Sequence, residues 1–338
     1  MKTYIDQLQY VLNNGTQTAD RTGTGTLSTF GLQSRYNLAN SFPAVTTKKL
    51  AWKACVGELL WMIEGSGDER RLAEITHGTA DGKVTIWTPN AMSSYWRHKA
   101  KFEGDLGRVY GVQWRHWQTP KIVHHPELDA SIVIMEEVDQ LTNLIEGIKQ
   151  DPHGRRHIMS AWNPGELDQM ALPPCHILAQ FYVTPFTQAE INTVYMQYRS
   201  RDDVNRMFLD PQFEGKIKTV EILRELGLPT GKLSCQMYQR SCDMFLGVPF
   251  NVASYSLLTH MIAQVCKLEA NEFIHVLGDA HIYLNHVDQV KEQLHREVMP
   301  APQLYLNPTI TDITKFTMDD IRLEGYTSHG AIKADMAV

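Results

Sequence analysis

The sequence predicts an α+β sandwich, a mixed and mostly antiparallel sheet with flanking helices and a buried central helix. Residues 50–65 and 251–270 are apolar nearly all round and long enough to be helices, which is typical of buried helices. Residues 232–241 alternate apolar and polar side chains, as a half-buried strand does, and residues 176–184 also have the pattern of a strand. Two buried helices and several short strands favour a single core.

In chain order, the pattern predicts a helix at residues 4–12, a Gly-Thr turn running into a strand at 20–31, and the first buried helix. Residues 66–130 are irregular and rich in Trp, Tyr and Gly, as ligand-binding loops often are. A helix is then expected over 132–149, followed by a polar turn and a short strand within 151–164.

In the second half, the strands at 176–184 and 232–241 are expected to pair as antiparallel neighbours. The residues between them, 185–232, number about 45, fewer than a separate domain usually needs, so we expect an extended strand connection with a helix at 216–226. Residues 1–338 are therefore predicted to form one domain. The end of the chain, 325–338, lacks periodicity and is expected to be mobile unless a ligand orders it.

Composition narrows the class of protein. The 338 residues are 43% apolar and 21% charged, as in ordinary globular proteins. The net charge of -6 disfavours a general nucleic-acid or membrane-surface binder, because such proteins need surplus positive charge. No apolar run approaches the ~18 residues that span a bilayer, and no signal peptide is evident, so a cytoplasmic location is expected. The 5 cysteines lack C-x-x-C pairing and zinc spacing, which predicts reduced thiols and no metal.

Two residues could carry chemistry despite their apolar surroundings. Glu58 has apolar residues three and four positions away on both sides, which places a carboxyl group in an apolar wall. Cys175 follows Pro173 and Pro174 at the start of a strand; a small core residue is the commoner role, and a nucleophile would need nearby positive charge. The adjacent His176 is expected to point to the opposite face of the strand.

Polar residues at turns and strand ends offer a binding site. Four arginines lie at predicted turns or strand ends: Arg21, Arg155, Arg156 and Arg240. A single arginine at such a place is usually a solvated surface charge, but together with Ser241 the four could bind a phosphate. Asn251 is either a helix N-cap or an amide that matches the N3–H and O4 edge of uracil. Asp243 is a turn residue or an acceptor for heterocycle N–H groups. His281 and Tyr283 share one strand face and could bind a sugar hydroxyl or form a core pair.

Several strings taken together resemble the thymidylate synthase family. They are DRTGTGT, FPAVTTKK, GELLWMIEG, VYGVQWR, RRHIMSAWNP, ALPPCH, QMYQRSCDMFLGVPFN, GDAHIYLNH and the terminal MAV. The match covers the chain except for 185–232 and variable stretches near 66–105, 117–130 and 295–320. The resemblance implies the fold of that family, an obligate homodimer, and the reductive methylation of dUMP to dTMP.

The resemblance also implies roles for single residues. Cys175 matches the nucleophile that adds to C6 of the uracil, Glu58 the carboxylate that organises proton transfer, and Tyr110 a residue near the departing C5 proton. Arg155 and Arg156 match the pair that reaches into the partner subunit's site. Eight positions match residues that bind dUMP in the family: Arg21, Arg240, Ser241, Asn251, His281, Tyr283, His176 and Gln239. Two of them, Arg240 and Asn251, also match catalytic positions.

The implied second substrate is 5,10-methylenetetrahydrofolate, which donates a one-carbon unit and then a hydride and ends as dihydrofolate. No other redox cofactor and no metal are implied. Lys48 matches a position towards the glutamate tail of the folate, and Val338 ends the tail that closes over it. The remaining folate positions are Ile86, Trp87, Leu172, Asp243, Leu246, Gly247 and Phe250.

The sequence leaves alternatives to methylation open. It departs from the usual family pattern at Arg108, Thr88 and Ala280, which touch the surroundings of the site. A dUMP 5-hydroxymethylase would use the same nucleophile with water in place of the hydride; a dCMP version is disfavoured because it usually carries Asp at the Asn251 position. Trp87 and the MAV tail favour hydride transfer. A nucleotide sensor or RNA-binding regulator is disfavoured by the net charge and the complete set of reactive groups.

Overall fold

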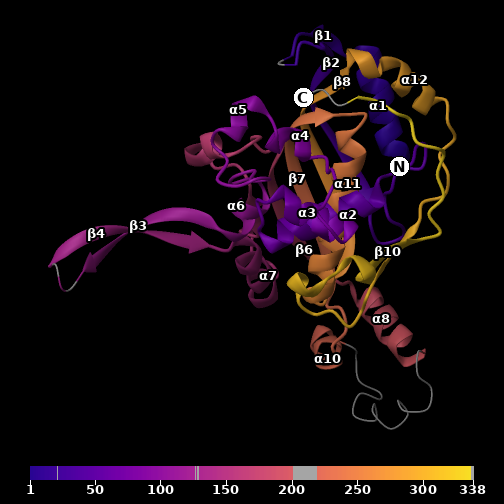
Figure 1. Ribbon diagram of the computed structural model, residues 1–338. Helices are drawn as coiled ribbons and strands as arrows, with labels where there is room; N and C mark the ends of the chain where they lie inside the picture. Colours follow the sequence, from indigo (N-terminus) through magenta and orange to yellow (C-terminus); the bar gives the residue numbers. More distant parts are fainter. Residues whose placement is uncertain (21, 126, 128, 201–218, 336–338) are drawn as a thin grey trace.

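A six-stranded sheet forms the centre of the computed structural model, which describes residues 1–20, 22–125, 127, 129–200 and 219–335 (Figure 1). All neighbouring strands run antiparallel except β7 and β8, which are parallel. The order across the sheet is β1 (Thr16–Thr18), β2 (Thr26–Asn37), β8 (Glu269–Tyr283), β7 (Gly231–Asp243), β6 (His176–Pro185) and β5 (Ile158–Ser160). The predicted α+β class, the mixed sheet and the pairing of β6 with β7 are confirmed.

Two buried helices pack together, and one of them, α11, lies against this sheet. Helix α2 (Trp52–Glu64) and helix α11 (Gly247–Val265) contact each other, and α11 also contacts β7 and β8. Both are buried nearly all round, as their composition predicts. Helix α11 begins at Gly247, and Pro249 fits its first turn. Asn251 therefore lies within the helix, and the predicted N-cap role of Asn251 is wrong.

The remaining helices flank this core or lie at its ends. The α-helices are α1 (Lys2–Asn14), α3 (Glu69–His77), α4 (Thr88–Ala91), α5 (Ser94–Arg97), α6 (Gly111–Arg115), α7 (Gln140–Gln150), α8 (Gln188–Ser200), α10 (Val220–Glu225) and α12 (Val287–Leu294). Short 3-10 turns lie at Pro164–Gln169, Leu284–His286, Ile313–Lys315 and Met318–Asp320. None of the helices in the described ranges is long and apolar enough to cross a membrane.

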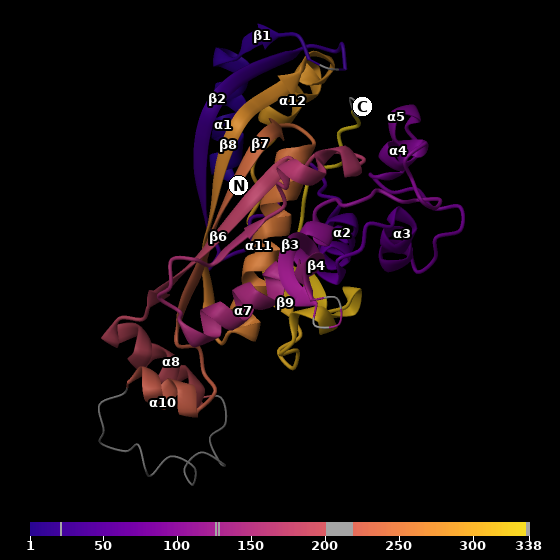
Figure 2. The same ribbon diagram turned by 90° about the vertical axis from the view of Figure 1, so that its left-hand side faces the viewer.

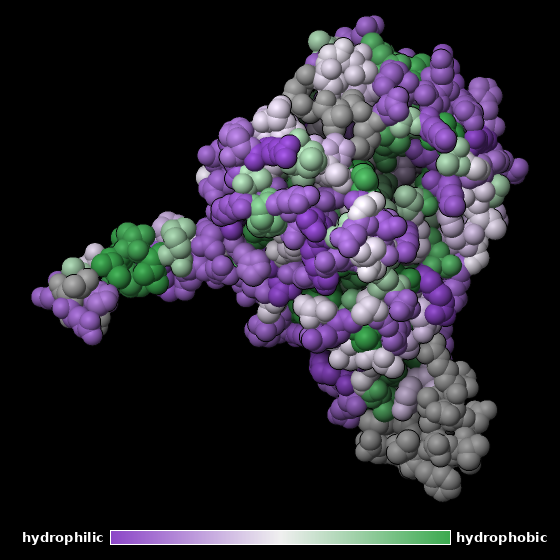
Figure 3. All heavy atoms as spheres, viewed as in Figure 1, coloured by the Kyte–Doolittle hydropathy of each residue, from purple (hydrophilic) through white to green (hydrophobic). Residues whose placement is uncertain are grey.

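A β-hairpin extends away from the body where the sequence predicts loop and helix (Figure 1). Strands β3 (Trp117–His125) and β4 (Ala130–Val138) pair antiparallel, and only α7 remains of the helix expected over 132–149. The run 132–134 contains three β-branched residues in succession, whose restricted side-chain rotamers favour a strand once a pairing partner is present. Its apolar side chains, among them Ile122 and Val133, are exposed (Figure 3).

Residues 66–116, also expected to be irregular, include helices α3 to α6. Helix α3 is capped at its start by Asp68, whose side chain accepts a hydrogen bond from the Arg70 amide, and at its end by Gly78 in the left-handed conformation. Of its four buried residues only Leu72 and Ala73 are apolar, which is too few to stand out as a periodic pattern. The helices in this segment are therefore a correction to the sequence-based expectation.

The segment between β6 and β7 carries helices α8 and α10, at the opposite end of the sheet from α12 (Figure 2). Its small apolar core is separate from the main one and consists of Phe186, Ile191, Val194, Tyr195, Ile222 and Leu223. An ion pair of 2.6 Å between Lys232 and Glu190 joins the segment to β7. The helix predicted at 216–226 is observed at Val220–Glu225, with 216–218 outside the described residues, and α8 was not predicted.

The C-terminal part ends as an extended strap along the body. Strands β9 (Gln303–Leu306) and β10 (Ile321–Glu324) form a small hairpin, and no regular structure follows as far as residue 335. The His329 amide donates to the Thr46 carbonyl at 2.9 Å, and a ring nitrogen of His286 lies 2.7 Å from the Asp335 carbonyl. The sequence pattern does not predict these contacts, since they join the strap to residues far away in the chain.

Candidate active site

A cavity of about 280 Å³ lies where the sheet meets the two buried helices. It collects side chains from α2, the segment around α4, the residues before β6, the ends of β7 and β8, and the start of α11. Its lining residues are Glu58, Ile86, Trp87, Asn90, Tyr110, Leu172, Cys175, His176, Gln239, Ser241, Asp243, Leu246, Gly247, Phe250, Asn251, His281 and Tyr283. All of them except Asn90 are predicted by the sequence analysis.

The Cys175 thiol faces this cavity from the residue directly before β6. Its amide donates to the Tyr110 hydroxyl at 2.7 Å. Arg240 donates to the carbonyls of Pro174 and Pro173 at 2.8 and 2.9 Å, which holds the proline pair that precedes the cysteine. Burial raises the pKa of the Cys175 thiol, and the charge of Arg240 and the hydrogen bonds from Tyr110 and Ser241 oppose that effect without cancelling it. The positive charge that a nucleophilic thiol needs is present as Arg240, but within one chain burial has the larger effect on the pKa of Cys175.

His176 lines the same cavity as Cys175, so the expectation that it points to the opposite face is wrong. Cys175 lies outside the regular strand, and the register is irregular between His176 and Leu178, so simple alternation does not apply there. The Nδ1 atom of His176 lies 2.8 Å from the Tyr255 hydroxyl. Burial, with a smaller contribution from His275, lowers the pKa of His176 to about 3, so the ring is neutral.

Tyr110 is held in an unusual backbone conformation beside the thiol. Its φ of 27° lies in the left-handed region, which is strained for a residue with a side chain. The next residue, Gly111, has no room for a Cβ, which would lie 2.4 Å from the Met62 carbonyl of α2. This close approach of α6 to α2 positions the Tyr110 ring, which stacks on His176 with centroids 4.1 Å apart.

Glu58 is a buried carboxyl group on α2 that accepts a hydrogen bond of 2.6 Å from the Trp87 indole N–H. Burial raises the pKa of Glu58 to about 7, although the hydrogen bond from Trp87 acts in the opposite direction. A carboxyl group with this pKa can accept or release a proton near neutral pH. The apolar surroundings predicted from the sequence of α2 are the cause.

The polar end of the cavity presents groups that can bind a sugar or a heterocycle. Asp243 accepts hydrogen bonds from the amides of Phe245 and Leu246 at 2.9 and 3.2 Å, where the chain turns into α11. His281 and Tyr283 face the same side of β8, with ring centroids 5.1 Å apart. Burial lowers the pKa of His281, but the hydrogen bond and negative charge of Asp279 outweigh it, so the pKa is raised overall.

The apolar wall fits a flat ring system. Ile86, Leu172 and Phe250 line the cavity together with Trp87, and Ile86 is half exposed at its entrance. Apolar and aromatic walls with a few oriented polar groups are usual in sites that bind drug-sized ligands. The wall therefore suits a flat, largely apolar ring system, and the Asp243 carboxylate adds a hydrogen-bond acceptor to the same cavity.

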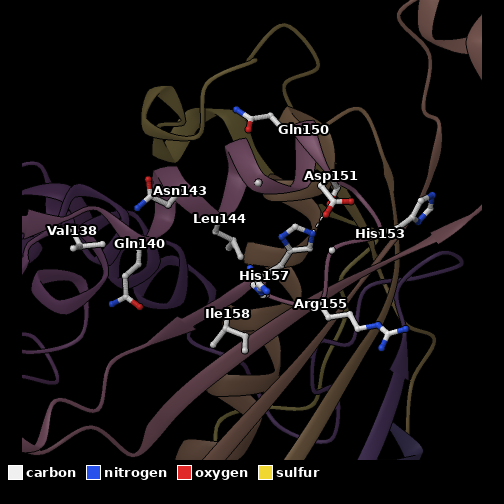
Figure 4. Close-up of a pocket in the computed structure, with 13 residues that line it drawn as sticks. Val138, Gln140, Asn143, Leu144, Gln150, Asp151, His153, Arg155, His157 and Ile158 are labelled. Carbon is white, nitrogen blue, oxygen red and sulfur yellow. Dashed lines mark hydrogen bonds between the residues drawn. The ribbon is translucent and has the colours of Figure 1, made fainter.

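Other predicted site residues lie elsewhere. Arg155 and Arg156 line a separate cavity of about 860 Å³ between α7 and β5, where a ring nitrogen of His157 bonds the Asp151 carbonyl (Figure 4). Lys48 is buried; its ammonium donates to the Phe245 carbonyl and lies 3.6 Å from the centre of the Phe245 ring, and burial lowers its pKa to about 8. Arg21 and Val338 lie outside the described residues.

Asn90 is the one lining residue that the sequence analysis did not identify. It belongs to the short helix α4, three residues after Trp87. Its only sequence signal is the turn-like string TPN, in which an asparagine is ordinarily a local turn former. Its place in the cavity follows from how α4 packs, which no local pattern indicates.

A family model described as thymidylate synthase matches residues 2–338. The chain belongs to the thymidylate synthase family. Members of this family use methylenetetrahydrofolate and act as transferases in nucleotide metabolism, and dUMP hydroxymethylases are among them. The six-stranded sheet agrees with the family fold. Within the described ranges, no group of three or more His, Cys, Asp or Glu side chains could hold a metal ion.

Proposed function

We propose that the chain converts dUMP and 5,10-methylenetetrahydrofolate to dTMP and dihydrofolate. The proposal rests on one observation: the Cys175 thiol and the Asn251 amide line the same cavity. The thiol would be the nucleophile, and the amide would form hydrogen bonds with the N3–H and O4 edge of uracil. Arg240 donates to the carbonyl of Pro174, the residue before Cys175, and Ser241, which lines the cavity, would bind the phosphate. His281 and Tyr283 line the same cavity and would bind the deoxyribose.

Cys175 forms the first bond in this mechanism. Its sulfur, after losing the proton, adds to C6 of the uracil, and the electron pair of the C5–C6 double bond moves to make C5 a nucleophile. Burial opposes loss of that proton, so Arg240 and the substrate phosphate ligands have to supply a compensating field. Glu58, with its pKa near 7, exchanges protons on the opposite side of the base, and Tyr110 is beside the C5 proton.

The folate, when bound, supplies the one-carbon unit and the hydride. The apolar wall of Ile86, Leu172 and Phe250 would hold its ring system, and Leu246 and Gly247 would line the edge of the pterin above Asp243. Lys48 would reach the glutamate tail only after its ammonium leaves the Phe245 carbonyl. The chain end with Val338 is proposed to close over this site and exclude water.

We also propose an obligate homodimer of a single cytoplasmic domain, in which residues 185–232 extend a strand connection. Arg155 and Arg156 lie outside the Cys175 cavity, which agrees with a role in the partner's site. Leu178 and Tyr182 are exposed on β6, whereas the alternating residue Phe181 is buried, so this sheet face has apolar side chains for a second copy to cover.

Product analysis tests the reaction. The protein is incubated with dUMP and methylenetetrahydrofolate, dihydrofolate formation is followed by absorbance, and the nucleotide is identified by mass spectrometry. Formation of dTMP and dihydrofolate supports the proposal. Hydroxymethyl-dUMP with tetrahydrofolate contradicts it and identifies the hydroxymethylase instead.

A cysteine substitution tests the nucleophile. Cys175→Ser is expected to abolish product formation and to retain dUMP binding, because the arginine, serine and amide ligands remain. Cys266→Ser is the matched control, since Cys266 lies outside the cavity and should keep full turnover. Sustained turnover by Cys175→Ser would show that the nucleophile is assigned to the wrong residue.

A further inference from the structure

A histidine that lies outside the cavity is hydrogen-bonded to its polar wall. His275 is on β8, has no exposed surface, and does not line the cavity. Its Nε2 atom lies 3.0 Å from the Oε1 atom of Gln239. Its other ring nitrogen, Nδ1, is buried and has no hydrogen-bond partner among the described residues. In the part of the chain that the structure describes, the single hydrogen bond of this imidazole is therefore with Gln239.

The orientation of the Gln239 amide follows from its two other contacts. Its Nε2 atom lies 3.0 Å from the Ser241 backbone carbonyl and 3.1 Å from Oδ1 of Asn251. A backbone carbonyl can only accept, so the group facing Ser241 has to be the NH₂ end of Gln239. The Oε1 end then faces His275, whose Nε2 must carry a hydrogen to donate to it.

This orientation determines how Asn251 presents its amide. One N–H of Gln239 is directed at Ser241 and the other at Oδ1 of Asn251. The Asn251 oxygen keeps one lone pair, and its NH₂ group keeps its donors, for a ligand in the cavity. A donor and an acceptor in this order match the O4 and N3–H of uracil.

We propose that His275 is a positioning residue that makes the site select uracil over cytosine through Gln239 and Asn251. Cytosine presents an acceptor at N3 and an amino group at C4, so it would need the Asn251 amide turned over. The NH₂ group of Asn251 would then face the NH₂ group of Gln239, two donors with no acceptor between them. For Gln239 to turn as well, its oxygen would face the Ser241 carbonyl, and its NH₂ group would need an acceptor at Nε2 of His275, so the imidazole would have to carry its proton on Nδ1. Nδ1 is buried and has no partner among the described residues, so that tautomer would leave an N–H group unsatisfied. His275 thus opposes the arrangement that cytosine requires.

The inference rests on the proposed binding of dUMP, and it is tested on binding without folate. Dissociation constants of dUMP and dCMP are measured by titration calorimetry for the wild type, His275→Phe and His275→Gln. The two nucleotides share the sugar and phosphate, so the ratio of their dissociation constants isolates recognition of the base. His260→Phe is the matched control: His260 is a second histidine of the core region, near Phe42 and outside the cavity.

His275→Phe removes the donor to Gln239, and a buried carbonyl without a donor costs enough to lower the preference for dUMP about tenfold or more. His275→Gln can still offer an N–H and should recover most of the preference, while His260→Phe should not change it. If His275→Phe does not fold, His275→Met tests the same loss with a more adaptable side chain. Thermal unfolding verifies that each variant is folded.

An unchanged ratio in the folded His275→Phe or His275→Met variant, with both dissociation constants raised equally, would overturn the inference and indicate a packing role alone. Failure of His275→Gln to recover any preference would also count against it. If the wild type binds neither nucleotide, the proposed function itself fails. If the wild type discriminates and the variants discriminate equally, only the role of His275 fails.

Discussion

Replacing Glu58 by Gln tests whether burial controls the proton chemistry of the cavity. The pKa of Glu58 is about 7 in the folded chain and 4.5 for an ordinary glutamate. As the pH rises, the unfolded chain therefore releases this proton first, and the folded chain loses stability between about pH 4.5 and 7. At about 1.4 kcal/mol for each pKa unit, the full loss is about 3 kcal/mol above pH 7.

Gln has nearly the same shape, can still accept from the Trp87 indole, and carries no charge. Glu58→Gln is therefore expected to gain about 2 to 3 kcal/mol relative to the wild type when the pH changes from 5 to 8. The assay is urea unfolding of both proteins at the two pH values. Glu64→Gln is the control, because Glu64 ends the same helix but is exposed and paired with Arg71.

The reasoning is refuted if the difference between Glu58→Gln and the wild type is the same at pH 5 and pH 8. In that case burial would not raise the pKa of this carboxyl group, and its proposed role in proton exchange near neutral pH would lose its physical basis. A difference of similar size in Glu64→Gln would instead indicate a general charge effect on stability.

Two further predictions concern the surroundings of the thiol. Arg240→Gln removes the charge that lowers the pKa of Cys175, so a smaller fraction of the thiol is ionised at pH 8. Alkylation of Cys175 by iodoacetamide at that pH, measured by peptide mass spectrometry, should therefore slow about threefold or more. The control Arg35→Gln, at a surface ion pair, should leave the rate unchanged. Gly111→Ala places a Cβ 2.4 Å from the Met62 carbonyl and should lower the free energy of unfolding, measured with urea, by about 2 kcal/mol or more. The control is Gly147→Ala in α7, whose Cβ would have its nearest contact at 3.4 Å and which should raise the free energy of unfolding by about 0.5 to 1 kcal/mol. Equal effects of the two substitutions would contradict the packing described at Gly111.

The hairpin shows where local sequence fails to predict structure. Residues 132–135 have apolar side chains that suit a helix or a strand, and pairing with Trp117–His125 determines the outcome. The helices α3 to α6 were missed for a related reason, since their short lengths leave few turns over which a period can be recognised.

The candidate site was largely predictable residue by residue, because the resemblance identifies chemical groups and their order along the chain. It did not predict the balance of forces on those groups. Cys175 has its arginine, yet burial still raises its pKa. Lys48 is present, yet its ammonium is occupied by a backbone carbonyl. Burial and hydrogen bonding depend on neighbours that come from distant parts of the chain.

The amino-acid sequence by itself determines the fold class, the two buried helices, the strand patterns of β6 and β7 and the apolar surroundings of Glu58, since each depends on local pattern or on side chains one helical turn apart. Only the tertiary structure decided the direction of the Asn251 amide, the separation of Arg155 and Arg156 from the thiol, and the contact of His275 with Gln239. Hydrogen bonds and electric fields act over a few ångströms in space, and folding alone brings residues such as Gln239 and His275 within that distance.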